Sequence, residues 1–124
     1  MESYLEHMAL RVKDLDWHLE FFKEVLGMDV RMTNQKEAPN RQVWLYGGLQ
    51  LIEDLSFDGP EGRCAHLGIM TENQKEVLDK AYARNVKELP QGHNWFQVSD
   101  GLCIEVIQVK ENGVQEYLDI DPWL

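Results

Sequence analysis

The sequence predicts an α+β protein made of two modules of the same plan, each a strand, a helix and three further strands. Short runs in which apolar and polar residues alternate predict strands, because successive side chains of a strand point to opposite faces. Two longer segments repeat apolar residues every three or four positions, as helices on a sheet do. A loop at 56–62, with two glycines and a proline, separates the halves. We therefore expect one domain over 1–124, with modules at 1–55 and 63–109 and a C-terminal tail at 110–124.

The first module opens with a strand at 5–12 and a helix at 14–26. Asp14 is placed as the N-cap of this helix and Gly27 as its left-handed C-terminal cap. The apolar stripe of the helix consists of Leu15, Leu19, Phe22 and Leu26. Three strands follow, at 29–32, 42–46 and 49–53. The pair Gly47-Gly48 between the last two predicts a two-residue hairpin.

The second module repeats this order. A strand at 64–71 leads to a helix at 73–84, whose inward residues are Val77, Leu78, Ala81 and Tyr82. Its three remaining strands are expected at 86–89, 95–99 and 102–109. The arrangement is therefore βαβββ written twice.

Three candidate metal ligands occupy comparable places in this pattern. His7, His66 and Glu105 each lie in a predicted strand on the face opposite its apolar stripe. A single strand histidine or glutamate is more often structural or solvated than a ligand. Two imidazoles and one carboxylate in a repeated pattern, however, are a set that holds a divalent ion and leaves positions open. We expect one iron, manganese, nickel, cobalt or zinc ion.

The run from His7 through Leu15, continued by Phe21-Phe22-Lys23-Glu24-Val25-Leu26-Gly27-Met28, resembles the opening of the vicinal oxygen chelate superfamily. His66 stands where that family opens its second module. The segment Asp100-Gly101-Leu102-Cys103-Ile104-Glu105 is similar to the closing family motif, with Ser99 where a proline is common. The resemblance extends to Val109. Its members include glyoxalase I, fosfomycin-resistance proteins, extradiol dioxygenases and bleomycin-resistance proteins.

The resemblance implies a cupped, mostly antiparallel sheet whose concave side holds the metal. It further implies a metal-dependent enzyme with lyase, isomerase or ring-cleaving dioxygenase chemistry on a small oxygen-chelating substrate. The alternative is a non-catalytic binding protein for a small molecule or antibiotic, like the bleomycin-resistance members. Family members of this length imply a homodimer, and the apolar residues of the tail favour one: Tyr117, Leu118, Ile120 and Trp123.

The first-module counterpart of Glu105 decides between members of the family. Aligning 48–52 with 101–105 sets Ile52 against Glu105, where glyoxalase I carries a glutamate, so this alignment argues against glyoxalase activity. Gln50 is the alternative fourth ligand. A register one residue different would bring in Glu53, at the cost of burying a charge.

Other departures narrow the resemblance. Ala9 stands where the fosfomycin enzymes have a threonine, and 90–94 lacks their serine-rich loop. Extradiol dioxygenases add a histidine and a tyrosine near the metal. His93 and Tyr46 are the candidates for those two roles.

Further residues are expected to face the substrate. Glu105 and His93 are the candidate catalytic residues. Arg11 is on the face of His7 and is suited to a carboxylate or phosphate, or else to a surface ion pair. The other substrate-binding candidates are Gln50, Trp44, Tyr46, Trp95 and Cys103.

Composition limits the partners. The net charge of −10 argues against nucleic acid and anionic membranes as partners, and no run of eighteen apolar residues or basic leader is present. We expect a cytoplasmic protein whose partner is a small-molecule substrate. Cys64 and Cys103 are expected to be reduced thiols, although a disulfide between them is the alternative.

Overall fold

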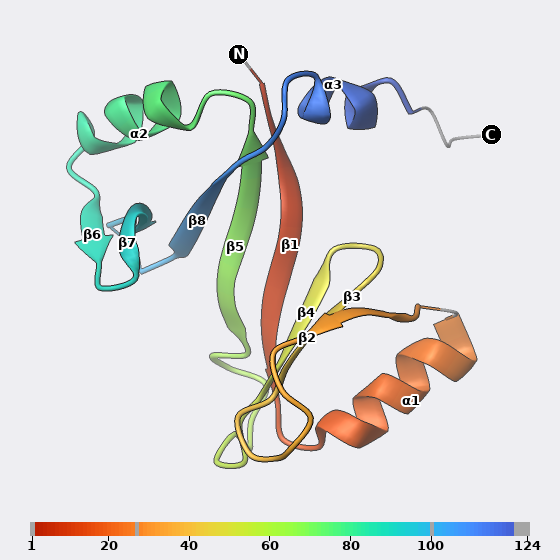
Figure 1. Cartoon of the computed structure of the whole chain (residues 1–124). Helices are drawn as coiled ribbons and strands as arrows, with labels where there is room; N and C mark the ends of the chain where they lie inside the picture. Colours follow the sequence, from red (N-terminus) through yellow and green to blue (C-terminus); the bar gives the residue numbers. More distant parts are fainter. Residues whose placement is uncertain (1, 27, 100, 121–124) are drawn as a thin grey trace. The chain divides into compact units, whose positions relative to one another are not determined.

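Strands and helices follow one another in the predicted order. The computed structural model describes residues 2–26, 28–99 and 101–120, and contains eight strands and three helices in these ranges (Figure 1). The strands form a mixed sheet in the order β2-β3-β4-β1-β5-β8-β7-β6. The predicted α+β class and the double βαβββ order are confirmed, and a third helix follows. The chain divides into two compact units, His7–His66 and Met1–Glu6 with Leu67–Leu124, so β1 and β5 contribute to both.

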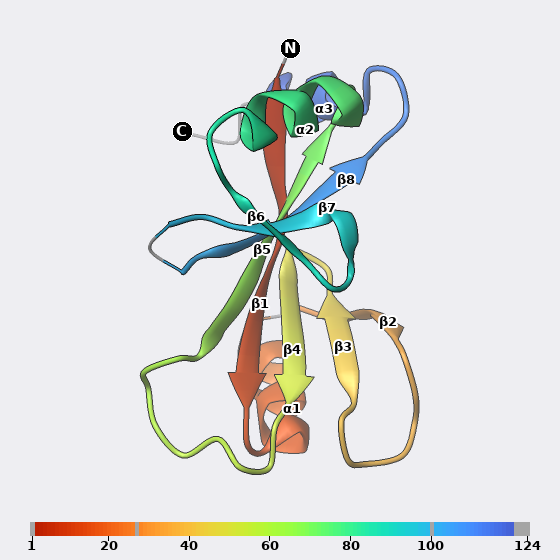
Figure 2. The same cartoon turned by 90° about the vertical axis from the view of Figure 1, so that its left-hand side faces the viewer.

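The elements of the first βαβββ set are β1 (Ser3–Val12), α1 (Leu15–Leu26), β2 (Val30–Thr33), β3 (Gln42–Leu45) and β4 (Leu49–Glu53). β4 runs parallel to β1 and antiparallel to β3, which in turn is antiparallel to β2 (Figure 2). The turn between β3 and β4 differs from the prediction. Leu45 pairs with Leu49, so the loop has three residues, and Gly47 and Gly48 adopt φ values of 103° and 90°. Such positive angles favour glycine because it lacks a Cβ.

Helix α1 begins where the sequence predicts. The backbone N–H of Trp17 donates to Asp14 Oδ1 at 3.1 Å, so Asp14 caps the helix. The helix packs on a core of Val12, Leu15, Val43, Leu45 and Leu51, with Leu19 and Phe22 against it. Leu26 is 54% exposed and does not belong to the buried stripe, contrary to the prediction. Met28 packs on this core instead. The predicted cap at Gly27 lies outside the described residues.

The elements of the second set are β5 (Cys64–Thr71), α2 (Gln74–Tyr82), β6 (Lys87–Leu89), β7 (Gly92–Gln97) and β8 (Cys103–Gln108). β8 is parallel to β5 and antiparallel to β7. Asn73 caps α2 through a side chain that accepts from the N–H of Glu76. The four predicted inward residues of the helix pack as expected, around a core of Leu78, Phe96 and Val106.

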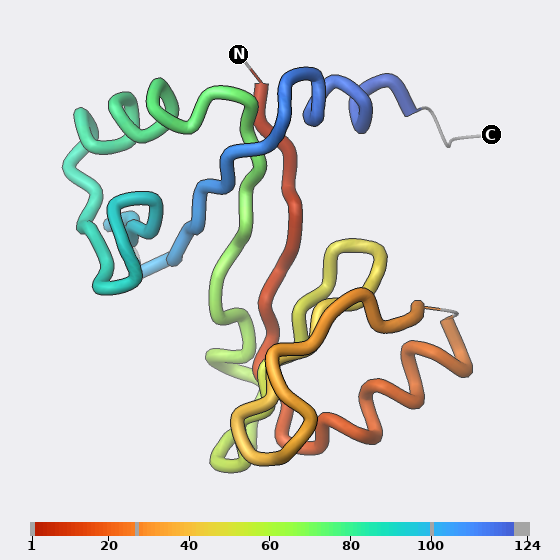
Figure 3. The backbone as a smooth tube through the Cα atoms, viewed as in Figure 1, coloured from red at the N-terminus to blue at the C-terminus, as the bar shows by residue number. Residues whose placement is uncertain are grey.

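Part of the tail is helical. Helix α3 (Gly113–Leu118) follows β8, as the backbone trace shows (Figure 3). Glu72 holds its start, because its carboxylate accepts from the N–H groups of Asn112 at 2.7 Å and Val114 at 3.1 Å. Tyr117 stacks on Tyr4 with ring centroids 5.2 Å apart. The described tail therefore docks on the body of the protein, whereas Asp100 and residues 121–124, with Trp123, lie outside the described residues.

Two further expectations concern the covalent and membrane state of the chain. Cys64 and Cys103 are free thiols, as predicted, although Cys64 is exposed. Within the described ranges, no helix has the length and apolar character needed to cross a membrane.

Candidate metal centre

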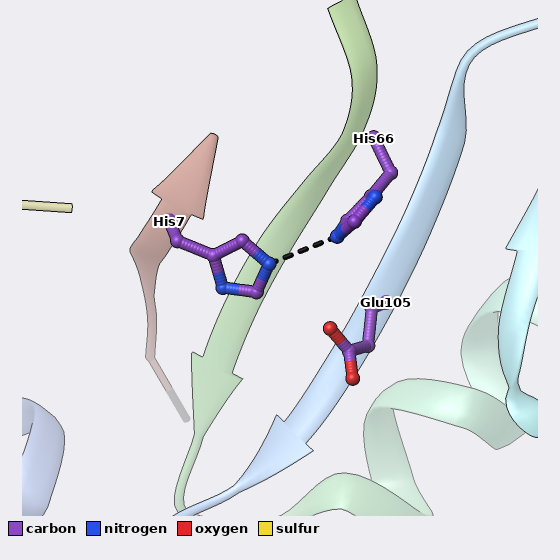
Figure 4. A group of neighbouring side chains, drawn as sticks. All are labelled: His7, His66 and Glu105. Atoms are coloured by element: carbon purple, nitrogen blue, oxygen red, sulfur yellow. Dashed lines mark hydrogen bonds between the residues drawn. The ribbon is translucent and has the colours of Figure 1, made fainter. Parts of the chain in front are cut away.

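Two buried histidines on β1 and β5 face each other. His7 is 5% and His66 is 8% exposed, and their Nε2 atoms lie 2.9 Å apart (Figure 4). The rings meet edge to face, with an angle of 89° between their planes. The predicted pair is therefore brought together, with the two Nε2 atoms at hydrogen-bond distance from each other.

Glu105 completes the group from β8. In the parallel pairing of β5 and β8, Glu105 lies opposite Gly68, two residues beyond His66 and on the same face. One ligand atom from each of His7, His66 and Glu105 lies within 4.8 Å of the other two (Figure 4). The three predicted ligands therefore form one cluster.

The donor atoms of this cluster suit a divalent ion. Metal–nitrogen bonds of about 2.1 Å at a right angle place two nitrogens about 3.0 Å apart, close to the observed separation of the two Nε2 atoms. Burial, together with His7 and Arg11, lowers the pKa of His66 to about 4. His66 is therefore neutral at pH 7, which is the state that binds a metal.

The strand register corrects the predicted counterpart of Glu105. Glu105 pairs with Gly68, the second residue after His66, and in the first module Ala9, the second residue after His7, pairs with Gln50. Ile52 pairs with Arg11, two positions further on. The alignment of 48–52 with 101–105 was wrong by two residues, and Gln50 is the structural counterpart of Glu105.

The environment of Gln50 agrees with a role at this site. The residue is 3% exposed, and its Nε2 donates to Gln42 Oε1 at 3.1 Å. Its carbonyl oxygen makes no hydrogen bond to any residue in the described ranges. Ala9, its partner on β1, is fully buried.

Glu53 belongs to a different part of the molecule. As expected, Glu53 shares the helix-covered face of β4 with Leu51. Its charge is nevertheless buried together with a partner. Arg41 donates from Nε to Glu53 Oε1 at 3.1 Å and from Nη2 to Oε2 at 2.7 Å. These hydrogen bonds hold the pKa of Glu53 below its usual value. Glu53 is therefore a structural residue.

The two tryptophans predicted to face the substrate occupy equivalent places. Trp44 pairs across β3 and β4 with Gln50, and Trp95 pairs across β7 and β8 with Glu105. Directly paired residues of neighbouring strands share a face. Each indole therefore lies beside the candidate ligand of its own module. The alternation in the sequence indicates only the face of each tryptophan and not its neighbour on the next strand.

Arg11 also lies on the ligand face of β1, where it makes a different contact from the predicted ion pair. Its Nη1 donates to the carbonyl of Gly62 at 2.7 Å, which holds the guanidinium at the loop before β5. Cys103 is half-buried on β8, two residues before Glu105 and on the same face.

Two candidates are placed elsewhere. His93 is exposed, stacks on Tyr82 with ring centroids 4.2 Å apart, and bonds through Nδ1 to Glu88. The ring of His93 is therefore engaged by α2 and β6 and does not belong to the metal cluster. Tyr46 was predicted as a strand residue, but it lies in the turn after β3 and is 60% exposed.

The chain resembles a bacterial protein in sequence. No family model matches the chain. A protein described as the uncharacterized protein YwbC of Bacillus subtilis strain 168 is 26% identical over 131 residues, covering 87% of this chain and 99% of that protein.

Three solved structures show the likeness in fold. A methylmalonyl-CoA epimerase in complex with methylmalonyl-CoA and NH4+ has a TM-score of 0.64 and 20% identity, covering 87% of this chain and 95% of its own. The epimerase of Mycobacterium tuberculosis has a TM-score of 0.62 and 18% identity, covering 90% and 91%. The hypothetical protein BH1468 of Bacillus halodurans C-125 has a TM-score of 0.62 and 16% identity, covering 90% and 97%. The chain therefore has the glyoxalase/bleomycin-resistance fold of these neighbours, an α+β fold with an open mixed sheet.

Proposed function

We propose that this protein is an enzyme that binds one divalent metal ion and acts on a small substrate with two neighbouring oxygens. The observation that carries the proposal is the cluster of His7, His66 and Glu105, with ligand atoms within 4.8 Å of one another. Gln50 is the proposed fourth ligand, because it is the structural counterpart of Glu105. Four protein ligands leave two positions of an octahedral ion for the substrate.

The residues around the cluster support this chemistry. A bound divalent ion would supply a Lewis acid for negative charge that develops on substrate oxygens. Trp44 and Trp95 lie beside the ligands and would exclude water from the substrate. Arg11 is on the ligand face of β1 and would orient an anionic group.

We propose isomerase or lyase chemistry for this site and not ring cleavage by dioxygen. The solved proteins of this fold described above that carry a named activity are epimerases. A non-catalytic binding protein of the bleomycin-resistance kind would need no metal. Two buried histidines with a carboxylate beside them favour the enzyme.

Metal binding tests the proposal. We expect purified protein, stripped with a chelator, to bind one equivalent of Mn²⁺, Co²⁺ or Zn²⁺ by calorimetry, with a rise in melting temperature. His66→Ala should weaken binding by more than about a hundredfold, since even residues that only orient metal ligands contribute about 10- to 100-fold. His18→Ala is the matched control, because His18 lies on α1 and bonds to the backbone of Asp14. A wild-type protein that binds no ion, or equal binding by both variants, would refute the proposal.

We further propose that the protein is a homodimer. Apolar side chains remain exposed near the first strand and the tail, including Leu5 at 45%, Leu118 at 41% and Ile120 at 61%. Light scattering after size exclusion should therefore give twice the chain mass of 14.5 kDa. A species with the mass of one chain at micromolar concentration would contradict this expectation.

A further inference from the structure

Within the described residues, the side chain of Gln50 makes one hydrogen bond, and that bond decides which end of its amide is available. A glutamine amide has one donor end and one acceptor end, and only the carbonyl oxygen can bind a metal ion. The donor end, Nε2, is bonded to Gln42 Oε1 at 3.1 Å. The acceptor end is therefore directed away from Gln42 and makes no hydrogen bond to the described residues.

Gln42 is itself fixed at the edge of the same face. In the pairing of β3 with β4, Gln42 lies opposite Ile52 and Trp44 lies opposite Gln50, so Gln42 is the diagonal neighbour of Gln50. The backbone of Gln42 is bonded in both directions to Asn34: its N–H donates to Asn34 Oδ1 at 2.8 Å, and its carbonyl accepts from the Asn34 N–H at 3.1 Å. The backbone that carries the acceptor, Gln42 Oε1, is therefore held in place.

We infer that Gln42 is a positioning residue for the metal centre, acting through Gln50. By accepting from Nε2 it holds the amide in the orientation that presents Oε1 to the ion. This inference rests on the proposed function, in which Gln50 is the fourth ligand. It goes beyond it by assigning a task to a residue that touches no metal.

Metal binding would also change the hydrogen bond between the two glutamines. A metal ion on the carbonyl oxygen would draw electron density from the amide and make its N–H a stronger donor. The bond to Gln42 would therefore strengthen on metal binding. Any acceptor at position 42 should serve, whereas an apolar side chain should leave the amide free to turn.

Variants at position 42 test this directly. Gln42→Met keeps the length of the side chain and removes the acceptor, and Gln42→Glu keeps the acceptor. We expect Gln42→Met to weaken Co²⁺ binding about tenfold. Gln42→Glu should bind at least as tightly as the wild type. Gln91→Met, an exposed glutamine between β6 and β7, is the control for the substitution itself.

A double-mutant cycle separates positioning from a general structural effect. In a Gln50→Leu background, Gln42→Met should have no further effect on Co²⁺ affinity, because the amide that it orients is gone. The visible spectrum of the Co²⁺ complex should also move in Gln42→Met toward that of Gln50→Leu, since the spectrum reports the ligand set. An equal loss of affinity in both backgrounds would overturn the inference.

The side-chain amide of Gln50 gives a readout without metal. Its NH2 protons should exchange slowly with solvent in the wild type and in Gln42→Glu, and faster in Gln42→Met, by NMR of the metal-free protein. Unchanged exchange in Gln42→Met would show that the hydrogen bond does not hold the amide. If the wild type binds metal, His66→Ala loses it and Gln42→Met does not differ from wild type, this inference fails while the proposed function stands. If the wild type binds no metal, both fail.

Discussion

Replacing Arg41 with methionine is expected to lower the free energy of unfolding by about 3–5 kcal/mol, as loss of one partner of a buried ion pair does. Glu53 is 5% exposed, and Arg41 supplies both of its side-chain ion-pair bonds. Without the guanidinium, the carboxylate is left charged among apolar side chains or must take up a proton. The backbone N–H of Arg41 also donates to Glu53 Oε1 at 3.2 Å, and this bond would remain. Urea unfolding at pH 7 measures the loss.

The same arginine provides its own control. Its Nη1 also bonds to Asp16 Oδ1 at 2.9 Å, but the Asp16 side chain is 75% exposed. An exposed ion pair is worth about 0–1 kcal/mol, so Asp16→Asn should change stability little. Equal losses for Asp16→Asn and Arg41→Met would show that burial of Glu53 is not the cause.

The pH dependence gives a second check on this pair. Because Arg41 lowers the pKa of Glu53, the folded protein releases this proton more easily than the unfolded chain does. The stabilisation is therefore complete above 4.5, the usual pKa of a glutamate side chain, and is lost as the pH falls through the lower pKa of the folded state. The difference between wild type and Arg41→Met should shrink below about pH 4.5. A difference that grows on acidification would contradict the assignment.

The parts of the fold that depend on local chemistry could be predicted from the sequence. Asp14 caps α1 through the N–H of Trp17, as predicted, because its side chain reaches a nearby backbone group. β4 and β5 have the predicted bounds because alternating apolar residues mark which face is buried. The same alternation placed His7 and His66 on one face each. Their meeting at 2.9 Å then followed from the repeated order of the modules.

Pairing between strands could not be predicted in the same way. Alternation fixes the face of a residue but does not determine its partner, because shifting a strand by two residues preserves the face. Ile52 and Gln50 share a face, so the sequence could not decide which of them is opposite Ala9. The pairing of β4 with β1 decides it, because Ala9 lies opposite Gln50 and Arg11 lies opposite Ile52.

Interactions between side chains from different strands were also beyond the sequence. Gln42 belongs to no sequence motif, and only the pairing of β3 with β4 places it beside Gln50. The sequence indicates that Glu53 shares a face with core residues, but it does not indicate the partner of the carboxylate, because Arg41 is twelve residues away along the chain. Two glutamines on neighbouring strands of a short hairpin, on the same face, are the one signal that could have pointed to Gln42.

Two matched glutamate substitutions test which residue of β4 lies at the metal centre. Gln50→Glu is expected to raise affinity for Zn²⁺ or Mn²⁺ about 10- to 100-fold, because a carboxylate replaces a neutral ligand. The attraction between two unit charges 4 Å apart, about 4 kcal/mol, offsets part of the cost of burying the new charge. Ile52→Glu adds the same group to the same strand and face, but opposite Arg11. It should leave the affinity within about twofold, since the new carboxylate would pair with the guanidinium. Calorimetry on chelator-treated protein gives both values. A larger gain for Ile52→Glu than for Gln50→Glu would restore the register in which Ile52 is the counterpart of Glu105, and would remove Gln50 from the site.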